Sequence, residues 1–158
     1  MSLNIRKAVL TDYLKVNELV KEVHQLHVSQ RPDVYVEIDT PLEIAYFEQL
    51  VSDANTTVWV VEDQQKRLVA YSVLKMMKPL SLRILKPTQI AFIDDFCVTT
   101  THQKQGIGKQ LFEHIKCQAK NRGATSLQLV VWEFNKEALL FYEALGMQTR
   151  NRRLELTL

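Results

Sequence analysis

The residues from Gln103 to Gly108 read Gln-Lys-Gln-Gly-Ile-Gly and place two glycines one residue apart, directly before a helix-like run. The chain has only four glycines, so half of them lie in this loop. Glycine at this spacing lets backbone N–H groups approach an anion without interference from a Cβ atom, and a helix N-terminus favours negative charge. The loop is typical of a pyrophosphate cradle, and it leaves open the alternative of a tight strand-to-helix turn.

Two adjacent carboxylates, Asp94 and Asp95, interrupt an otherwise apolar run that ends at Val98. An unpaired carboxylate in a buried strand is costly, so the pair predicts a bulge or a cleft at this point. One of the two can serve as a base in proton transfer. The alternative is one solvated acid and one structural acid that pairs with a base.

Three other residues that could do chemistry carry weaker signals. His24 and His27 are spaced like metal ligands on one helix, but no third ligand accompanies them, so no metal is expected. Cys97 is conceivable as an acyl-carrying nucleophile, although no base lies beside it in the sequence. Two cysteines form neither a disulfide framework nor a metal cluster, which favours a reducing, cytoplasmic location.

The elements that must position these residues follow from hydrophobic periodicity and cap signals. We expect one domain over residues 1–158, a size that buries about 68–70% of its unfolded surface. Predicted strands cover residues 3–8, 56–61, 68–75, 89–98 and 125–132, with a last strand pair in 147–158. Predicted helices cover 13–31, 40–53, 107–121 and 135–145, the second opened by a capping box at Thr40 and the last two ended by Gly123 and Gly146. This order predicts an α/β fold with a mixed sheet covered by helices.

Charge is distributed unevenly along the chain, although the net charge is only +2. Residues 32–53 contain six acids and no lysine or arginine, whereas residues 100–158 contain nine bases and five acids. This polarity fits one cationic and one anionic ligand, or simply two solvated faces.

No apolar run approaches the ~18 residues of a membrane span and no signal-peptide pattern is present, so no membrane partner is expected. The basic loop in 75–86 is interpreted as a solvated loop, and no nucleic-acid partner is expected.

Taken together, the motifs resemble those of the GCN5-related N-acetyltransferase (GNAT) family over nearly the whole chain. The strand Phe92–Val98 followed by Gln103-x-x-Gly106-x-Gly108 is similar to the family's acetyl-CoA loop, in which Arg is more common than Gln at the first position. The segment from Asn135 to Met147 is similar to the family's Asn-x-x-Ala-x-x-Phe-Tyr-x-x-x-Gly-Phe pattern. The resemblance implies a GNAT fold, with six to seven strands in a mixed sheet and about four flanking helices.

The resemblance also implies which residues hold acetyl-CoA, the expected cosubstrate. Backbone N–H groups of the glycine loop would bind the pyrophosphate, and the strand near Cys97 would bind the pantetheine arm. A Val98 N–H could polarise the thioester carbonyl, an effect of roughly 3 kcal/mol for one donor. The residues assigned to the cofactor are Phe96, Cys97, Val98, Gln103, Lys104, Gln105, Gly106, Ile107, Gly108, Lys109, Asn135 and Tyr142.

By the same resemblance, an amine attacks the thioester directly. An alkyl ammonium has a pKa near 10.4, so only about one molecule in a few thousand is nucleophilic at pH 7 and a base is needed. Asp94 occupies the position where polyamine acetyltransferases place a proposed catalytic Glu, and because Asp is shorter we expect it to act through a water. Tyr142 would protonate the departing thiolate. That transfer is uphill by about 2 kcal/mol, so either the pKa of Tyr142 is lowered locally or the transfer is concerted with C–S cleavage.

The acceptor is predicted to be a cationic primary amine, because the acid-rich stretch 32–53 belongs to the expected acceptor side. Polyamines, aminoglycosides, and peptide or protein amines all remain open. The alternatives are a protein N-acetyltransferase and an acyl-CoA-binding regulatory domain without turnover. Dimerisation is common in the family, so a homodimer formed through the last strands is a further expectation that the resemblance allows.

Overall fold

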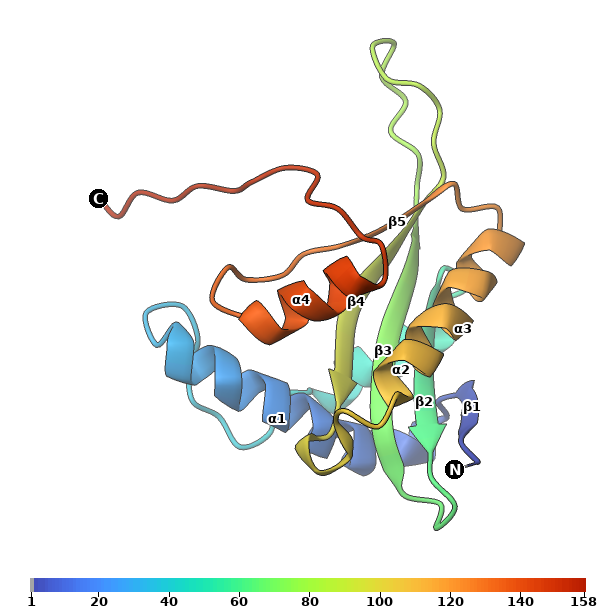
Figure 1. The fold of residues 1–158 in the computed structure, drawn as a ribbon, viewed down its shortest axis with the longest axis vertical. Helices are drawn as coiled ribbons and strands as arrows, with labels where there is room; N and C mark the ends of the chain where they lie inside the picture. Colours follow the sequence, from blue (N-terminus) through green and yellow to red (C-terminus); the bar gives the residue numbers. More distant parts are fainter. Residues whose placement is uncertain (1) are drawn as a thin grey trace.

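A computed structural model describes residues 2–158 as one sheet with helices on both faces (Figure 1). The strands of this part of the chain are β1 (Asn4–Lys7), β2 (Thr56–Glu62), β3 (Leu68–Met77), β4 (Ile90–Val98) and β5 (Ser126–Leu129). They lie in the order β1-β2-β3-β4-β5, with antiparallel pairing up to β4 and parallel pairing between β4 and β5. The helices are α1 (Tyr13–Gln30), α2 (Ile44–Ser52), α3 (Ile107–Asn121) and α4 (Lys136–Ala144). The expected mixed α/β fold is therefore confirmed.

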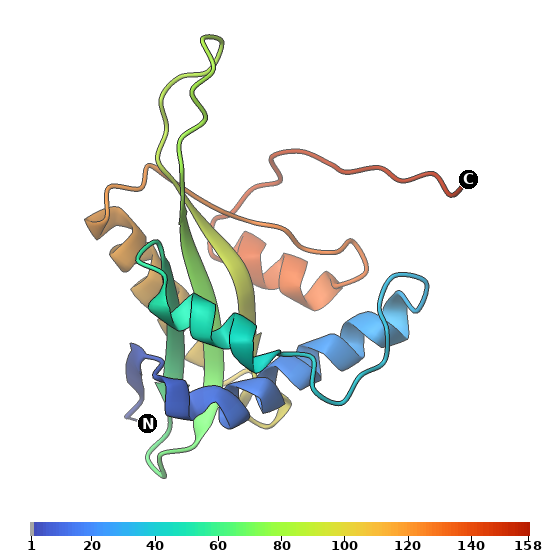
Figure 2. The ribbon, with the colours of Figure 1, turned by 180° about the vertical axis from the view of Figure 1, so that it is seen from behind.

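Each face of the sheet has its own buried cluster, because side chains alternate along a strand. In β2, Val58 and Val60 pack with α1 and α2, whereas Trp59 and Val61 pack with α3. The two helix layers are visible from opposite sides, α3 and α4 in Figure 1, α1 and α2 in Figure 2. None of the helices in residues 2–158 is long and apolar enough to cross a membrane.

The predicted bulge lies at Asp94. Asp95 is paired with Val73 and Ile93 with Leu74, so Asp94 is an extra residue in β4 without a partner on β3. The hydroxyl of Ser72, which is fully buried, donates a 2.7 Å hydrogen bond to the carbonyl of Asp95 and holds the bulged backbone. Placing a carboxylate in this strand thus required an interruption of the ladder, as expected.

The bulge also marks the point where β4 and β5 part. β5 is paired with β4 only over Ile90–Ile93, and the chain after Leu129 leaves the sheet. The segment 94–98 of β4 therefore has β3 on one side and no strand on the other, within the residues that the structure describes. This open edge runs directly toward the N-terminus of α3.

Three boundaries differ from those predicted. Residues 40–43 form no helix turn, because Leu42 is buried and its N–H donates to Asn17 Oδ1 at 3.1 Å; Glu43, not Thr40, is the N-cap of α2. β5 ends at Leu129 instead of 132. The prediction of a last strand pair in 147–158 was wrong, because this segment is extended but has no strand partner. Residues 2–158 therefore contain five strands instead of the expected six or seven. The helix ends at Gly123 and Gly146 are confirmed, with φ of +85° and +89°.

Replacing Ser72 by Ala tests the support of the bulge. The buried Asp95 carbonyl would lose its donor, so we expect the free energy of unfolding to fall by about 1–3 kcal/mol. Urea denaturation measures the change. Ser81→Ala, at an exposed position in the β3–β4 connection, is the matched control and should change stability by less than about 0.5 kcal/mol. Equal effects of the two substitutions would contradict the role of Ser72.

Candidate functional site

The N-terminus of α3 is built as an anion site. Gly106 is its N-cap with φ +81°, and a Cβ atom built on Gly106 would have no protein atom within 4 Å. The first helical hydrogen bond runs from Gln110 N to Gly106 O at 3.1 Å, so the N–H groups of 107–109 have no partner within the helix. Open space, free donors and the nearby lysines Lys104 and Lys109 suit a phosphate group.

Two other residues of the loop have roles that the sequence pattern did not reveal. A Cβ at Gly108 would lie 3.2 Å from two ring carbons of Phe141, so glycine at this position lets α3 approach α4. The side chain of Gln103 donates from Nε2 to the carbonyl of Val98 at 3.1 Å and ties the loop to the end of β4. Only Gly106 of the two glycines thus faces open space.

Tyr142 lies on the sheet side of α4, next to the open edge of β4. Its ring meets Phe96 edge-on with 6.1 Å between centroids and also contacts Phe112. Burial raises the pKa of Tyr142 above its usual value, and the charges of Asp95 and Cys97 add to this. Of the two alternatives that the sequence left open, this direction argues against a locally lowered pKa of Tyr142 in the free protein.

Asn135 is the N-cap of α4, where its Oδ1 accepts a 3.1 Å hydrogen bond from Ala138 N. This contact starts the helix that carries Tyr142. A contact between Asn135 and the cofactor stays a prediction.

The carboxylate of Asp94 holds an ammonium group. Lys75 Nζ lies 2.7 Å from Asp94 Oδ2, 3.4 Å from the hydroxyl of Tyr46 and 5.9 Å from the centre of the Tyr46 ring. Desolvation disfavours the charged form of Lys75, but the hydrogen bonds to Asp94 and Tyr46 outweigh it and raise its pKa. A carboxylate and an aromatic ring thus form a binding site for an ammonium ion. No sequence pattern indicated this group, because its members lie in three separate elements.

Asp95 has a different environment from Asp94. Its carboxylate accepts hydrogen bonds from the hydroxyl of Tyr71 and from Phe96 N, the latter at 2.9 Å. Burial raises the pKa of Asp95 despite these donors, and burial also raises the pKa of Tyr71. Asp95 is therefore tied into the bulge, whereas Asp94 reaches outward to a cation.

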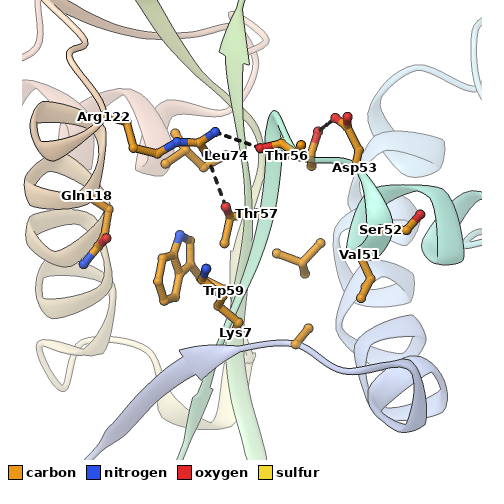
Figure 3. Close-up of a pocket in the computed structure, with 13 residues that line it drawn as sticks. Lys7, Val51, Ser52, Asp53, Thr56, Thr57, Trp59, Leu74, Gln118 and Arg122 are labelled. Carbon is orange, nitrogen blue, oxygen red and sulfur yellow. Dashed lines mark hydrogen bonds between the residues drawn. The ribbon is translucent and has the colours of Figure 1, made fainter.

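Asp94 and Asp95 both line a cavity of about 270 Å³ between α1, α2 and the bulge, together with Tyr46 and Phe47. A larger hollow of about 490 Å³ lies beyond the end of β1, where Trp59 and Arg122 line it (Figure 3). There Arg122 donates to the carbonyl of Ala54 at 2.9 Å, which ties α3 to the start of β2. The larger hollow contains neither the bulge carboxylates nor the glycine loop, so we place the site at the smaller one.

An aromatic cluster joins the loop after α1 to the connection between β5 and α4. Trp132 Nε1 donates to the hydroxyl of Tyr35 at 2.9 Å, and Tyr35 stacks on His27 with 5.0 Å between centroids. His24 Nε2 lies 2.7 Å from the carbonyl of Val36. Both histidines thus have structural contacts, and within residues 2–158 no three potential ligand side chains come together for a metal.

Cys97 points away from the open edge, into the cluster beneath α1. Its Sγ lies 3.5 Å from the carbonyl of Leu19, and burial raises the pKa of the thiol well above its usual value. A protonated, enclosed thiol is a poor nucleophile. This environment argues against the acyl-carrying role, and any contact of Cys97 with a ligand would be through its backbone.

The site therefore combines a helix N-terminus that is open to an anion with a bulged strand, β4, that parts from its parallel neighbour β5. The model of the Acetyltransferase (GNAT) family matches residues 20–147. The chain therefore belongs to the GNAT acetyltransferase family, as its motifs indicated.

Individual relatives support the family and the fold. The chain is 32% identical to a mutant form of the BH1408 protein of Bacillus halodurans, with a TM-score of 0.95 over 98% of this chain and 99% of that one. It is 33% identical over 57 residues to thialysine N-ε-acetyltransferase of Bos taurus, a match covering 36% of this chain and 34% of the relative. The fold alone is shared with the aminoglycoside N-acetyltransferase AAC(6′)-Iy in complex with CoA, at a TM-score of 0.78 and 14% identity over 99% of this chain and 94% of that one.

Thiol labelling tests the environment of Cys97. In the folded protein only the exposed Cys117 should react with a neutral-pH thiol reagent, and both cysteines should react after denaturation. In a Cys117→Ser variant, labelling should be at least about tenfold slower than in the wild type, because burial keeps the remaining thiol protonated and covered. Rapid labelling of that variant would restore Cys97 as a candidate nucleophile.

Proposed function

We propose that the protein transfers an acetyl group from acetyl-CoA to the primary amine of a cationic small molecule by direct attack. The observation that carries this proposal is the ammonium of Lys75, held between the Asp94 carboxylate and the Tyr46 ring. The ammonium lies at the bulge, where the open edge of β4 begins. An acceptor ammonium that replaced it would meet the same carboxylate and the same ring.

On the donor side, the proposal assigns the pyrophosphate of acetyl-CoA to the N-terminus of α3, around Gly106. The pantetheine arm would lie along the open edge of β4 and form strand-like hydrogen bonds with the backbone of residues 96–98. Acetyl-CoA supplies the activated thioester, and a Val98 N–H would polarise its carbonyl. The remaining loop residues named by the family pattern, among them Gln105 and Ile107, would contribute backbone N–H groups.

For catalysis, we assign Asp94 to hold the amine and to accept its proton through a water. Asp95 is the weaker candidate base, since two donors already bind its carboxylate. Tyr142 keeps a proton on its hydroxyl beside Phe96, and it would give this proton to the leaving thiolate as the C–S bond breaks. Because burial raises the pKa of Tyr142 and does not lower it, we propose that the proton transfer from Tyr142 is concerted with cleavage of the C–S bond.

The names of relatives agree with an amine acceptor: one is a thialysine N-ε-acetyltransferase and another an aminoglycoside N-acetyltransferase. Acetylation of protein amines would need a surface that accommodates a backbone, whereas the cavity beside Asp94 measures about 270 Å³. That volume favours a small molecule. A regulatory domain that binds acyl-CoA without turnover would have no use for the proton held on Tyr142.

The first prediction of this proposal concerns the binding of acetyl-CoA. Gly106→Val should reduce acetyl-CoA affinity at least about tenfold, because its side chain would enter the space left for the phosphate. Gly123→Val is the matched control: φ is positive at both glycines and neither has an atom within 4 Å of a built Cβ. Both variants should lose similar stability from backbone strain, but only Gly106→Val should lose affinity in calorimetric titration. Equal affinities would refute the cradle.

The second prediction concerns the acid. Tyr142→Phe removes the proton donor but keeps the ring against Phe96, so kcat should fall about 10²–10⁴-fold with little change in the KM for acetyl-CoA. Steady-state kinetics with thiol detection measures both constants. An unchanged kcat would eliminate this role.

The third prediction of this proposal concerns the ammonium-binding site formed by Asp94 and Tyr46. Asp94→Asn should raise the acceptor KM about 10- to 100-fold, the range expected for loss of a charge-assisted hydrogen bond. Lys75→Met should lower the acceptor KM, because the competing ammonium is gone. Lys78→Met, a change to an exposed lysine just beyond β3, is the control and should leave KM unaltered. A rise in KM in Lys75→Met would contradict the competition.

A further inference from the structure

The larger hollow, of about 490 Å³, lies where the sheet narrows beyond the end of β1. β1 has only four residues and pairs with β2 over Trp59–Glu62, so residues 56–58 at the start of β2 have no strand beside them on that side in the described part of the chain. The end of α2 and the end of α3 border the space that is left (Figure 3). Its volume lies within the range of about 300–1,000 Å³ that is usual for small-molecule sites.

The indole N–H of Trp59 lacks an acceptor at the border of this hollow. Trp59 lines the hollow and is 6% exposed, and its Nε1 has no hydrogen-bond partner. Figure 3 shows the nitrogen at the end of the ring that is directed toward Thr57 and Arg122. Buried polar groups are normally paired, and leaving one unpaired is costly. Because an indole N–H only donates, the partner that it lacks is a hydrogen-bond acceptor.

A second unpaired nitrogen lies against the same ring. The rings of Trp59 and His114 pack edge to face with 4.4 Å between centroids. Nε2 of His114 and Nε1 of Trp59 are the two buried side-chain nitrogen or oxygen atoms in residues 2–158 that have no partner. The unsatisfied polar groups of this part of the chain therefore gather at one place, beside the hollow, and not in the core at large.

Further donors line the hollow on the same face of the sheet as the indole. Lys7 lies opposite Trp59 in the β1–β2 ladder, so the two side chains project from one face. Gln118 of α3 and Arg122, the C-cap of that helix, also line the hollow. The contact of Arg122 with the carbonyl of Ala54 at 2.9 Å fixes the position of the guanidinium. Because a guanidinium has five N–H donors, several remain for a ligand.

The charges of the hollow favour a ligand with one negative charge. Two of its three charged residues are cations, Lys7 and Arg122, and the third is Asp53. The hydroxyl of Thr56 donates to the Asp53 carboxylate and lowers its pKa, so this carboxylate is ionised at neutral pH. A single anionic group therefore meets an excess of positive charge, whereas Asp53 would repel a second one. Apolar side chains supply another part of the wall, namely Val51, Val58 and Leu74.

We infer that this hollow is a binding site for a small organic monocarboxylate. The carboxylate would accept charge-assisted hydrogen bonds from Lys7 and Arg122 and a further one from the indole N–H of Trp59. Since Nε1 is covered, the carboxylate reaches it as the flexible side chain of Gln118 turns aside. The hydrocarbon part of the ligand would lie on the apolar wall. The hollow contains neither Asp94 nor the glycine loop, so this site is additional to the one proposed for acetyl transfer.

Proton–nitrogen correlation NMR of the full chain observes the indole directly. The chain has two tryptophans, and a Trp132→Phe variant identifies the indole signal of Trp59. Titration with sodium hexanoate should shift the Trp59 indole proton downfield to saturation and leave the Trp132 signal in place. Hexanamide, which has the same shape without the charge, and inorganic phosphate, which has no apolar part, should each bind at least about tenfold more weakly than hexanoate.

Substitutions in the hollow test the donors. Lys7→Met changes an exposed side chain and should weaken hexanoate binding about tenfold in calorimetric titration, because one charge-assisted hydrogen bond is lost. Lys120→Met removes the same charge from an exposed lysine of α3 outside the hollow, and it should bind hexanoate like the wild type. Trp59→Phe keeps an aromatic ring without the N–H and should also bind more weakly, with an unchanged far-UV circular dichroism spectrum.

Three outcomes would overturn the inference. The first is a Trp59 indole signal that hexanoate does not move. The second is equal affinity of Lys7→Met and Lys120→Met for hexanoate. The third is binding of hexanamide or inorganic phosphate as tight as that of hexanoate, since the hollow would then recognise a neutral molecule or a bare anion.

Discussion

The bulge at Asp94 is the constraint on which the other features of the site depend. An extra residue in β4 turns one carboxylate outward to Lys75 and leaves the next one bound to Tyr71 and Phe96. At the same residue the pairing with β5 ends, so the following part of β4 keeps an open edge. The bulge is held by the buried hydroxyl of Ser72 beneath the Asp95 carbonyl. Because successive side chains of a regular strand point to opposite faces, a strand without the bulge would direct the two carboxylates to opposite, helix-covered faces of the sheet, where an unpaired charge is costly.

The donor and acceptor sides of the proposed reaction meet at this bulge from opposite faces of the sheet. The glycine-capped end of α3 and the Tyr142 ring lie with the cluster beneath α3, whereas the cavity with Tyr46 lies beneath α1 and α2. A nucleophile held at Asp94 and a thioester held along the edge of β4 would therefore approach each other across one strand. Burial raises the pKa of Tyr142, so in the proposed reaction its hydroxyl would hold a proton for the leaving thiolate.

The sequence predicted those features whose causes are local. The glycine loop, the bulge and the ends of α3 and α4 each follow from residues within a few positions of one another, and all are found. The start of α2 was missed because Asn17, 25 residues earlier, captures the N–H of Leu42. The Lys75–Asp94–Tyr46 group was missed because its members come together only through the β3–β4 pairing and the packing of α2. The leucines at 154, 156 and 158 do alternate with polar residues, but residues 147–158 have no strand partner in the structure and form no strand.

The acceptor side is tested most directly by thiol release from acetyl-CoA with a matched series of primary amines. The series would compare alkylamines that are ammonium ions at neutral pH with isosteric amines that are neutral there and with amines that carry an anionic group. Because Asp94 and Tyr46 form a binding site for an ammonium ion, we expect the highest kcat/KM for the cationic members of the series. Turnover confined to neutral or anionic amines, or binding of acetyl-CoA without thiol release for any amine, would contradict the account.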